Sequence, residues 1–224
     1  MCGRYVSPEQ ASIERAWKID RASSNPFPRR FNVQPTTAVP MLRLEDGART
    51  LSGARWGLIP HWWKQDKPPS FSINARLEDI SRKPMWRDPI RRSRCLVPAE
   101  GWYEWQETPS GKQPHYITRR DRRPFCFAGL YAHWRDTLSC AILTTQALSP
   151  IAEVHDRMPV VLADEDHAAW LDPARRDASA VTAMALAPMA PGEFVHFPVS
   201  RRVNSAKNEG PELIEPLPAQ AAAR

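Results

Sequence analysis

The prediction of the fold rests mainly on residues 95–145, which read CLVPAEGWYEWQETPSGKQPHYITRRDRRPFCFAGLYAHWRDTLSCAILTT. Short apolar and aromatic segments alternate in it with polar turns such as residues 109–112. This pattern is typical of consecutive strands joined by tight connections. We predict strands over 101–107, 115–120, 125–134 and 139–145. Within the first of them, Trp102 and Glu104 should share one face, and Tyr103 and Trp105 the other.

The flanking sequence adds shorter elements. Ser7 as cap, Pro8 in the first turn and Glu9 predict a helix to about residue 18, followed by a loop over 19–36. We expect strands over 39–44 and 49–56, an ordered loop over 56–70 and an extended segment over 71–76. Short helices should cover 77–80, 149–154 and 164–171, with a strand at 160–161 and mostly irregular chain over the last sixty residues.

Many short strands, few helices and no repeated βαβ unit predict an α+β fold. We expect a single domain over residues 1–217, with a largely antiparallel sheet as its core and short peripheral helices. Residues 218–224 should form a frayed C-terminal tail.

Composition limits the class of protein. The 224 residues are 42% hydrophobic and 25% charged, which excludes a wholly disordered chain. No apolar run is long enough to span a membrane, and the first residues have no apolar signal segment. We therefore expect a protein of the cytoplasm, associated with the bacterial nucleoid when it is bound to DNA, and without a membrane partner. The net charge of +6, the excess of arginine and the nine tryptophans fit a nucleic-acid surface, or codon bias in a GC-rich genome.

The four cysteines are Cys2, Cys95, Cys126 and Cys140. Their irregular gaps contain no closely paired ligands, so we expect no zinc site and no other metal. A cytosolic chain keeps its thiols reduced, so disulfides are not expected. Three of the cysteines lie in apolar strings and should be small buried hydrophobes. Cys2 differs because it follows the initiator methionine directly.

Removal of Met1 would make Cys2 the N-terminal residue, with an amine and a thiol on adjacent carbons. Their reference pKa values of about 8 and 8.5 leave both partly deprotonated near neutrality. The amine can condense with an aldehyde, and the thiol can then close a five-membered thiazolidine ring. The alternative is that Cys2 is merely the second residue of a frayed terminus.

Other candidates are weaker when taken singly. His155 lies at a predicted element boundary and could transfer protons near pH 7, or be an ordinary surface histidine. Glu104 stands in the aromatic string WYEW, where burial would raise its pKa, or it could face solvent. Asn74 could orient a substrate oxygen and Arg76 could bind a phosphate, or they could serve as a backbone cap and a surface residue.

Taken together, these residues resemble the SRAP family, the SOS response-associated peptidase or abasic-site-processing proteins. The resemblance runs in the family's order from residue 1 to about 217. The matching strings are MCGRY (1–5), FNVQP (31–35), WGLIP (56–60), NARLE (74–78), PAEGWYEW (98–105), AGL (128–130), HDRMP (155–159) and VNSAKN (203–208).

The resemblance implies a protein that crosslinks to abasic sites in DNA. Cys2, freed of Met1, would form a Schiff base with the ring-opened sugar and then a thiazolidine. Asn74 would hold the cysteine and the sugar, Glu104 would assist proton transfer, and His155 would act in ring opening and crosslink reversal. A lyase activity through the Schiff base, and a peptidase activity that removes Met1, are also implied. No cofactor is expected.

The resemblance also implies the DNA contacts. The partner would be single-stranded DNA, or a single-strand/duplex junction, that contains an abasic site. Arg4 and Arg76 would grip phosphates, Trp62 and Trp63 would form an aromatic wedge, and Thr144 would line the site. Arginine suits phosphate, and tryptophan suits the face of a base. We expect a monomer.

Two other functions remain open from the residues. A cysteine protease with Cys2 and His155 as a dyad would cleave other proteins without DNA. A non-covalent reader of nucleic acid, for instance of modified cytosine, would bind reversibly and salt-sensitively and would survive loss of Cys2.

Overall fold

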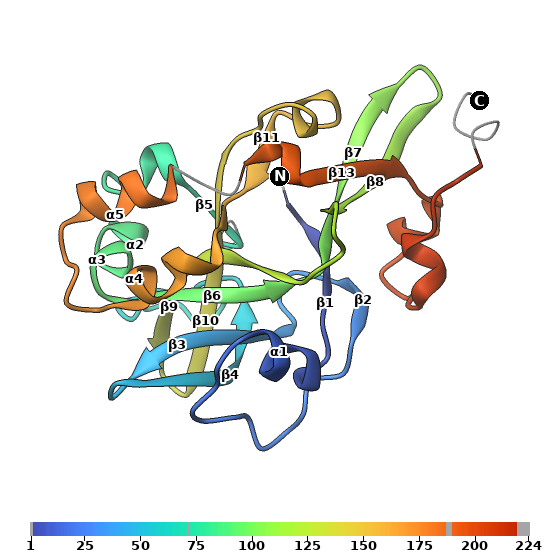
Figure 1. The fold of residues 1–224 in the computed structure, drawn as a ribbon. Helices are drawn as coiled ribbons and strands as arrows, with labels where there is room; N and C mark the ends of the chain where they lie inside the picture. The colour runs from blue at the N-terminus through green and yellow to red at the C-terminus, as the bar shows by residue number, and fades with distance from the viewer. Residues whose placement is uncertain (1, 71, 187–189, 219–224) are drawn as a thin grey trace.

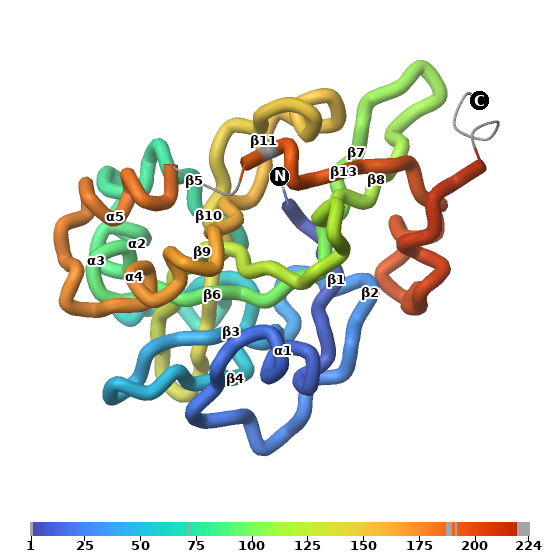
Figure 2. The backbone as a smooth tube through the Cα atoms, in the orientation of Figure 1, coloured from blue at the N-terminus to red at the C-terminus, as the bar shows by residue number. Residues whose placement is uncertain are grey.

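Two β-sheets form the body of the molecule in a computed structural model that describes residues 2–70, 72–186 and 190–218 (Figure 1). The first sheet has five strands in the order β13-β8-β7-β1-β2, all antiparallel. Its strands are β1 (Arg4–Ser7), β2 (Arg30–Val33), β7 (Gly101–Thr108), β8 (Gly111–Arg119) and β13 (Phe194–Pro198). Figure 2 shows the path of β1 between those of β2 and β7.

The second sheet has the order β11-β10-β4-β3-β6-β9-β12, and β5 pairs with β10. Most pairs are antiparallel, whereas β10 runs parallel to both β4 and β5. Its strands are β3 (Ala38–Glu45), β4 (Ala48–Trp56), β5 (Asn74–Arg76), β6 (Arg94–Ala99), β9 (Phe125–Trp134), β10 (Thr137–Gln146), β11 (Arg157–Pro159) and β12 (Val161–Leu162).

An aromatic core includes side chains from both sheets. Trp102 of β7 packs edge-on against Phe125 and Phe127 of β9 and Phe194 of β13, with ring centroids 5.4–6.1 Å apart. Tyr5 of β1 makes the same kind of contact with Phe127. Edge-to-face contacts of this kind add to the free energy of burying apolar area. The core therefore fixes β1, and with it the residues just before β1, against both sheets.

The α-helices are short and peripheral. They are α1 (Gln10–Ala16), α2 (Pro84–Arg87), α3 (Pro89–Arg92), α4 (His167–Leu171) and α5 (Ala178–Ala185). The 3₁₀ turns are η1 (Leu77–Asp79), η2 (Ile151–Glu153), η3 (Asp164–Asp166), η4 (Pro191–Glu193), η5 (Arg201–Asn204) and η6 (Pro211–Ile214). The buried Arg94 guanidinium joins α3 and α4 to β6, because it donates to the carbonyl oxygens of Ile90 and Trp170 at 2.8 and 2.6 Å. None of the helices in the described residues is long and apolar enough to cross a membrane.

The predicted fold class is confirmed, since the architecture is α+β with largely antiparallel sheets. The strands expected in residues 95–145 are present as β7, β8, β9 and β10, and those at 39–44 and 49–56 as β3 and β4. The expected segments at 77–80 and 149–154 are the 3₁₀ turns η1 and η2, and the segment at 164–171 is η3 followed by α4.

Two predictions about the chain were wrong. The first helix begins at Gln10, because Val6 and Ser7 are buried at the end of β1. The predicted loop over 19–36 contains β2, which pairs with β1 across the chain. The expectation of mostly irregular chain over the last sixty residues is confirmed for the described positions, among which α4, α5 and β13 are the regular elements. Of the expected frayed tail, residues 219–224 lie outside the described residues, as does Phe71 of the extended segment.

Candidate active site

Cys2 lies just before β1 and is fully buried. The antiparallel register pairs Arg4 with Tyr103 and Tyr5 with Trp102, so residues preceding β1 run along β7 toward Glu104. The Glu104 carboxylate is close enough to act electrostatically on the Cys2 thiol. Burial, reinforced by that carboxylate, raises the pKa of the thiol well above its usual range. The thiol is therefore neutral in this state of the molecule.

Asn74 holds the backbone of Cys2. It begins β5, which runs parallel to β10 with Asn74 opposite Ile142. Its Nδ2 donates a hydrogen bond of 2.7 Å to the carbonyl oxygen of Cys2. The amide oxygen of Asn74 is buried and has no hydrogen-bond partner within the described ranges. An unsatisfied buried acceptor is uncommon in folded proteins, and here it is available to an amine or hydroxyl beside Cys2.

Glu104 is a buried carboxyl group, with 1% of its area exposed. The alternation along β7 places it on the same face as Trp102, as the sequence predicted. Desolvation by the surrounding protein raises its pKa to about 7. Near neutral pH the group is therefore present in both protonation states and can act as an acid or a base.

His155 approaches Glu104 from the segment that follows η2. Its Nε2 lies 3.9 Å from Glu104 Oε2. Its Nδ1 accepts a 2.9 Å hydrogen bond from the backbone N–H of Arg157, and Asp156 Oδ1 is 3.0 Å from the same nitrogen. Because the Asp156 carboxylate is 85% exposed, we take the backbone bond as the one that sets the tautomer, with the Nε2 proton toward Glu104. Burial lowers the pKa of His155.

A cavity of about 440 Å³ lies beside Glu104 and His155. Its lining residues are Glu104, Trp105, Lys112, His155 and Asn204. Trp105, Lys112 and Asn204 were not among the predicted site residues. Strand alternation assigned Trp105 to the face opposite Glu104, and Asn204 lay in a matching string to which no role was given. The indole Nε1 of Trp105 donates a 2.8 Å hydrogen bond to Asn204 Oδ1, which joins these two strings.

The segment that carries Asn204 is held by the N-terminal strands. Arg4 donates to Asn32 Oδ1 at 2.7 Å and to the carbonyl oxygen of Val203 at 3.0 Å. Asn32 donates in turn to the carbonyl oxygen of Asn208 at 2.9 Å. Arg4 therefore stabilises the packing of this segment against the N-terminal strands. Its contact with a DNA phosphate remains a prediction.

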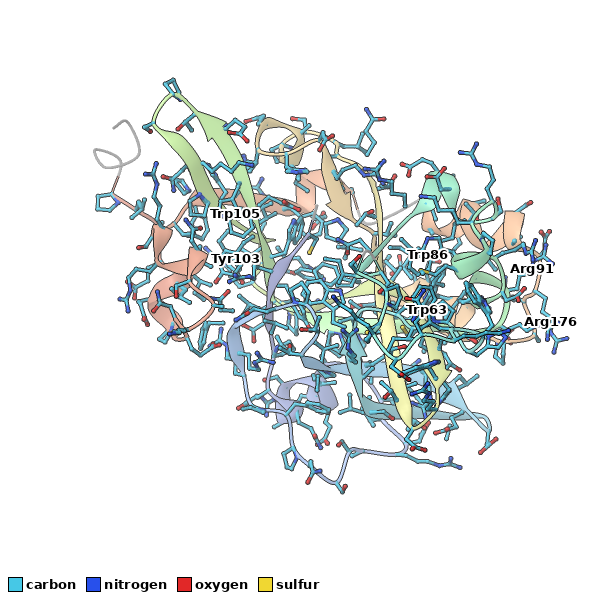
Figure 3. All side chains as sticks on the ribbon, turned by 180° about the vertical axis from the view of Figure 1, so that it is seen from behind. Trp63, Trp86, Arg91, Tyr103, Trp105 and Arg176 are labelled. Carbon is cyan, nitrogen blue, oxygen red and sulfur yellow. The ribbon has the colours of Figure 1, made fainter. Side chains whose placement is uncertain are left out.

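The other predicted DNA-binding residues fall into two groups. Arg76 is exposed on β5 beside Asn74, and Thr144 lies opposite it on β10 and is fully buried. Trp62 and Trp63 lie on the loop after β4, with ring centroids 6.1 Å apart and Trp62 46% exposed. Figure 3 shows Trp63 well apart from Trp105. Their contacts with DNA remain predictions.

Two further features bear on the chemistry. Cys95, Cys126 and Cys140 are buried in β6, β9 and β10, as the sequence predicted. Across residues 2–70, 72–186 and 190–218, no three His, Cys, Asp or Glu side chains are grouped as metal ligands would be. The polar groups gathered around Cys2 are instead a donor amide, a titratable carboxyl and an imidazole, which suit proton transfer.

Comparisons with known proteins agree with the motifs. Residues 1–206 match the family model described as SOS response associated peptidase (SRAP). The chain is 37% identical to the abasic site processing protein YoqW of Bacillus subtilis over 96% of this chain and 99% of that protein. It is 33% identical to the abasic site processing protein YedK of Escherichia coli over 97% of this chain and 100% of that protein.

Solved structures show the same fold. A Bacteroides thetaiotaomicron protein superposes with a TM-score of 0.81 at 23% identity, over 97% of this chain and 100% of that chain. A phage-related protein of Bordetella bronchiseptica gives a TM-score of 0.71 at 34% identity, over 89% of this chain and 95% of that chain. From the family model and the curated relatives, we conclude that the chain belongs to the SOS response associated peptidase (SRAP) family.

Proposed function

We propose that this protein processes abasic sites by forming a covalent crosslink with them through Cys2 after Met1 is removed. The observation that carries the proposal is the position of Cys2. Its carbonyl is held by Asn74 at 2.7 Å, its thiol lies within electrostatic reach of Glu104, and Glu104 lies 3.9 Å from His155. The names of the curated relatives support abasic DNA as the substrate.

The crosslink forms in two steps. The free amine of Cys2 attacks the aldehyde carbon of the ring-opened deoxyribose, and the carbinolamine loses water to give a Schiff base. The thiol then adds to the C=N carbon, so that a C–S bond forms and the thiol proton is transferred, by way of Glu104, to the ring nitrogen. The product is a thiazolidine, and the overall change is the loss of one water molecule.

Glu104 and His155 divide the proton transfers. A carboxyl group with a pKa of about 7 can protonate the departing hydroxyl and later accept the thiol proton. His155, kept neutral by burial, can take the sugar hydroxyl proton when the ring opens and return it when the crosslink reverses. The buried oxygen of Asn74, which has no partner within the described residues, can accept a hydrogen bond from the freed Cys2 amine and so hold it beside the aldehyde.

The same site accounts for two associated activities in this proposal. The Schiff base makes β-elimination of the 3′ phosphate possible, which is a lyase reaction. Hydrolysis of the Met1–Cys2 peptide bond by the protein itself supplies the free amine. We further propose that residues 1–217 act as one domain and as a monomer, on single-stranded DNA or strand junctions in the cytoplasm.

The test is incubation with a single-stranded oligonucleotide that contains one abasic site. The wild type should give an adduct that survives heating in denaturant, and Cys2→Ala should give none. Cys2→Ser keeps an amine that can form a Schiff base but cannot close the thiazolidine, so its adduct should require borohydride. Cys140→Ala serves as the matched thiol control and should behave as wild type.

Other outcomes favour the other functions. A heat-stable adduct that persists in Cys2→Ala rules out the proposed chemistry. Salt-sensitive binding without any adduct would indicate a non-covalent reader. Cleavage of peptides that depends on Cys2 and proceeds without DNA would indicate a protease acting on other proteins.

A further inference from the structure

Trp105 has an unusual setting among the nine tryptophans. It is only partly buried and packs at the edge of a cluster that contains Tyr103 and Tyr116. Figure 3 shows it on β7, next to Tyr103 along the strand. Within the part of the chain that the structure describes, no aromatic ring or guanidinium stacks on the indole of Trp105. By contrast, Trp102 contacts three phenylalanine rings, and the guanidinium of Arg135 lies over the ring of Trp134.

The position of this ring is fixed by a hydrogen bond. Its Nε1 donates to Asn204 Oδ1 at 2.8 Å, and Asn204 lies in η5, whose neighbouring carbonyl at Val203 is held by Arg4. A buried or half-buried indole usually finds a partner for its N–H, and this partner then orients the ring. The indole is therefore held in place before any ligand arrives, and one part of it lines the cavity that contains Glu104 and His155.

The cavity is lined by side chains that have no role in the proposed chemistry, and it has space beyond what the sugar would fill. Glu104 and His155 act on the sugar, and an abasic sugar has no base to fill the remaining space. Lys112 stands at the same opening and forms an ion pair with Glu107, at 2.9 Å, in which both side chains are largely exposed. Such an exposed pair is weak, so the ammonium can exchange Glu107 for a phosphate. An aromatic ring next to a cation suits a nucleotide.

We propose that Trp105 is a substrate-binding residue that stacks on the nucleobase adjacent to the lesion, with Lys112 on the phosphate of that nucleotide. Stacking is independent of base identity, since every base offers a π face. The interaction would place the abasic sugar between Trp105 and Cys2. This inference rests on the proposed function, because it assumes that the sugar occupies the site of Glu104 and His155.

The experiment separates binding from crosslinking. The DNA carries a tetrahydrofuran residue, which has no aldehyde, at the lesion position, and it is flanked either by adenines or by further tetrahydrofuran residues. Trp105→Leu should bind the adenine-flanked DNA about 5- to 30-fold more weakly than wild type. On the DNA without flanking bases the two proteins should agree within about 2-fold. Trp105→Phe keeps a ring and should restore most of the affinity.

A fluorescent base gives a second readout. With 2-aminopurine beside the lesion, binding of wild type should quench the fluorescence, and Trp105→Leu should lose most of that quenching. Leu186→Ala is the control, because this exposed apolar side chain after α5 lies outside the cavity and has no predicted contact with DNA. The inference is overturned if Trp105→Leu weakens both DNAs equally, or if it leaves both the affinity and the quenching unchanged. Failure of the proposed function would appear separately, as the absence of an adduct between wild type and a true abasic site.

Discussion

Replacing Glu104 by glutamine should stabilise the folded protein at alkaline pH while it slows crosslinking. The pKa of Glu104 rises from 4.5 to about 7 because the carboxyl group is buried. The folded state therefore holds a proton that the unfolded state releases between these two values. Wild-type stability contributed by this group falls as pH rises from about 4.5 to 7, and the loss is complete above pH 8. Glutamine has the same shape and no proton to lose.

The size of the effect follows from the shift. The pKa rises by about 2.5 units, and each unit corresponds to about 1.4 kcal/mol. The free energy of unfolding of Glu104→Gln should therefore exceed that of wild type by about 3 kcal/mol more above pH 8 than below pH 4. For a chain of this length that is about 6–12 °C in melting temperature. The comparison uses urea unfolding of wild type and Glu104→Gln at pH values from 4 to 9. Glu107→Gln, on an exposed side chain of the same strand, is the matched control and should show no such trend.

A stability difference between wild type and Glu104→Gln that does not change with pH would contradict the raised pKa of Glu104. A variant less stable than wild type at pH 9 would refute it as well. In the crosslinking assay the same variant should lose about 10²-fold or more in rate, as expected for removal of an acid–base group. A catalytic group that lowers stability is a common compromise at functional sites.

Three other changes test separate parts of the structure. Asn74→Ala should slow crosslinking about 10-fold or more, because the bond to the Cys2 carbonyl is lost; an unchanged rate in single-turnover assays would remove Asn74 from the site. Gly101→Ala should destabilise the fold by about 2 kcal/mol or more, since a Cβ would lie 2.4 Å from the Tyr116 ring; an unchanged urea midpoint would contradict this packing. Thiol labelling of native Cys2→Ala should be slow, because the remaining cysteines are buried; rapid labelling would show that one of them is accessible.

Much of the fold was visible in the sequence because its strands have strong local signals. The alternation in WYEW and the turn at residues 109–112 predicted β7 and β8, and the apolar runs predicted β9 and β10. The first helix was misplaced because Ser7, Pro8 and Glu9 fit a helix start as well as they fit the end of β1. Residues up to Ser7 belong to β1 because this strand pairs with both β2 and β7, between which it lies. The conformational propensity of a few consecutive residues contains no information about a strand partner that lies about 95 residues away in the sequence.

The site was only partly predictable. Cys2, Asn74, Glu104 and His155 were chosen from their chemistry and from family strings, and the structure brings them together from β5, β7 and the segment after η2. Trp105 was missed because strand alternation puts it on the face opposite Glu104, and only the cavity shows that both line one opening. Asn204 was missed because its contact with Trp105 spans 99 positions of sequence.

The decisive measurement is the mass of the heat-stable product that wild-type protein forms with abasic DNA in the absence of borohydride. We expect the mass of the protein without Met1 plus that of the DNA, less one water, with the modification on Cys2 after proteolysis. Retention of Met1 in the crosslinked species would contradict the proposed crosslink, because an acylated Cys2 nitrogen cannot form the Schiff base. Attachment to any other residue would contradict it equally.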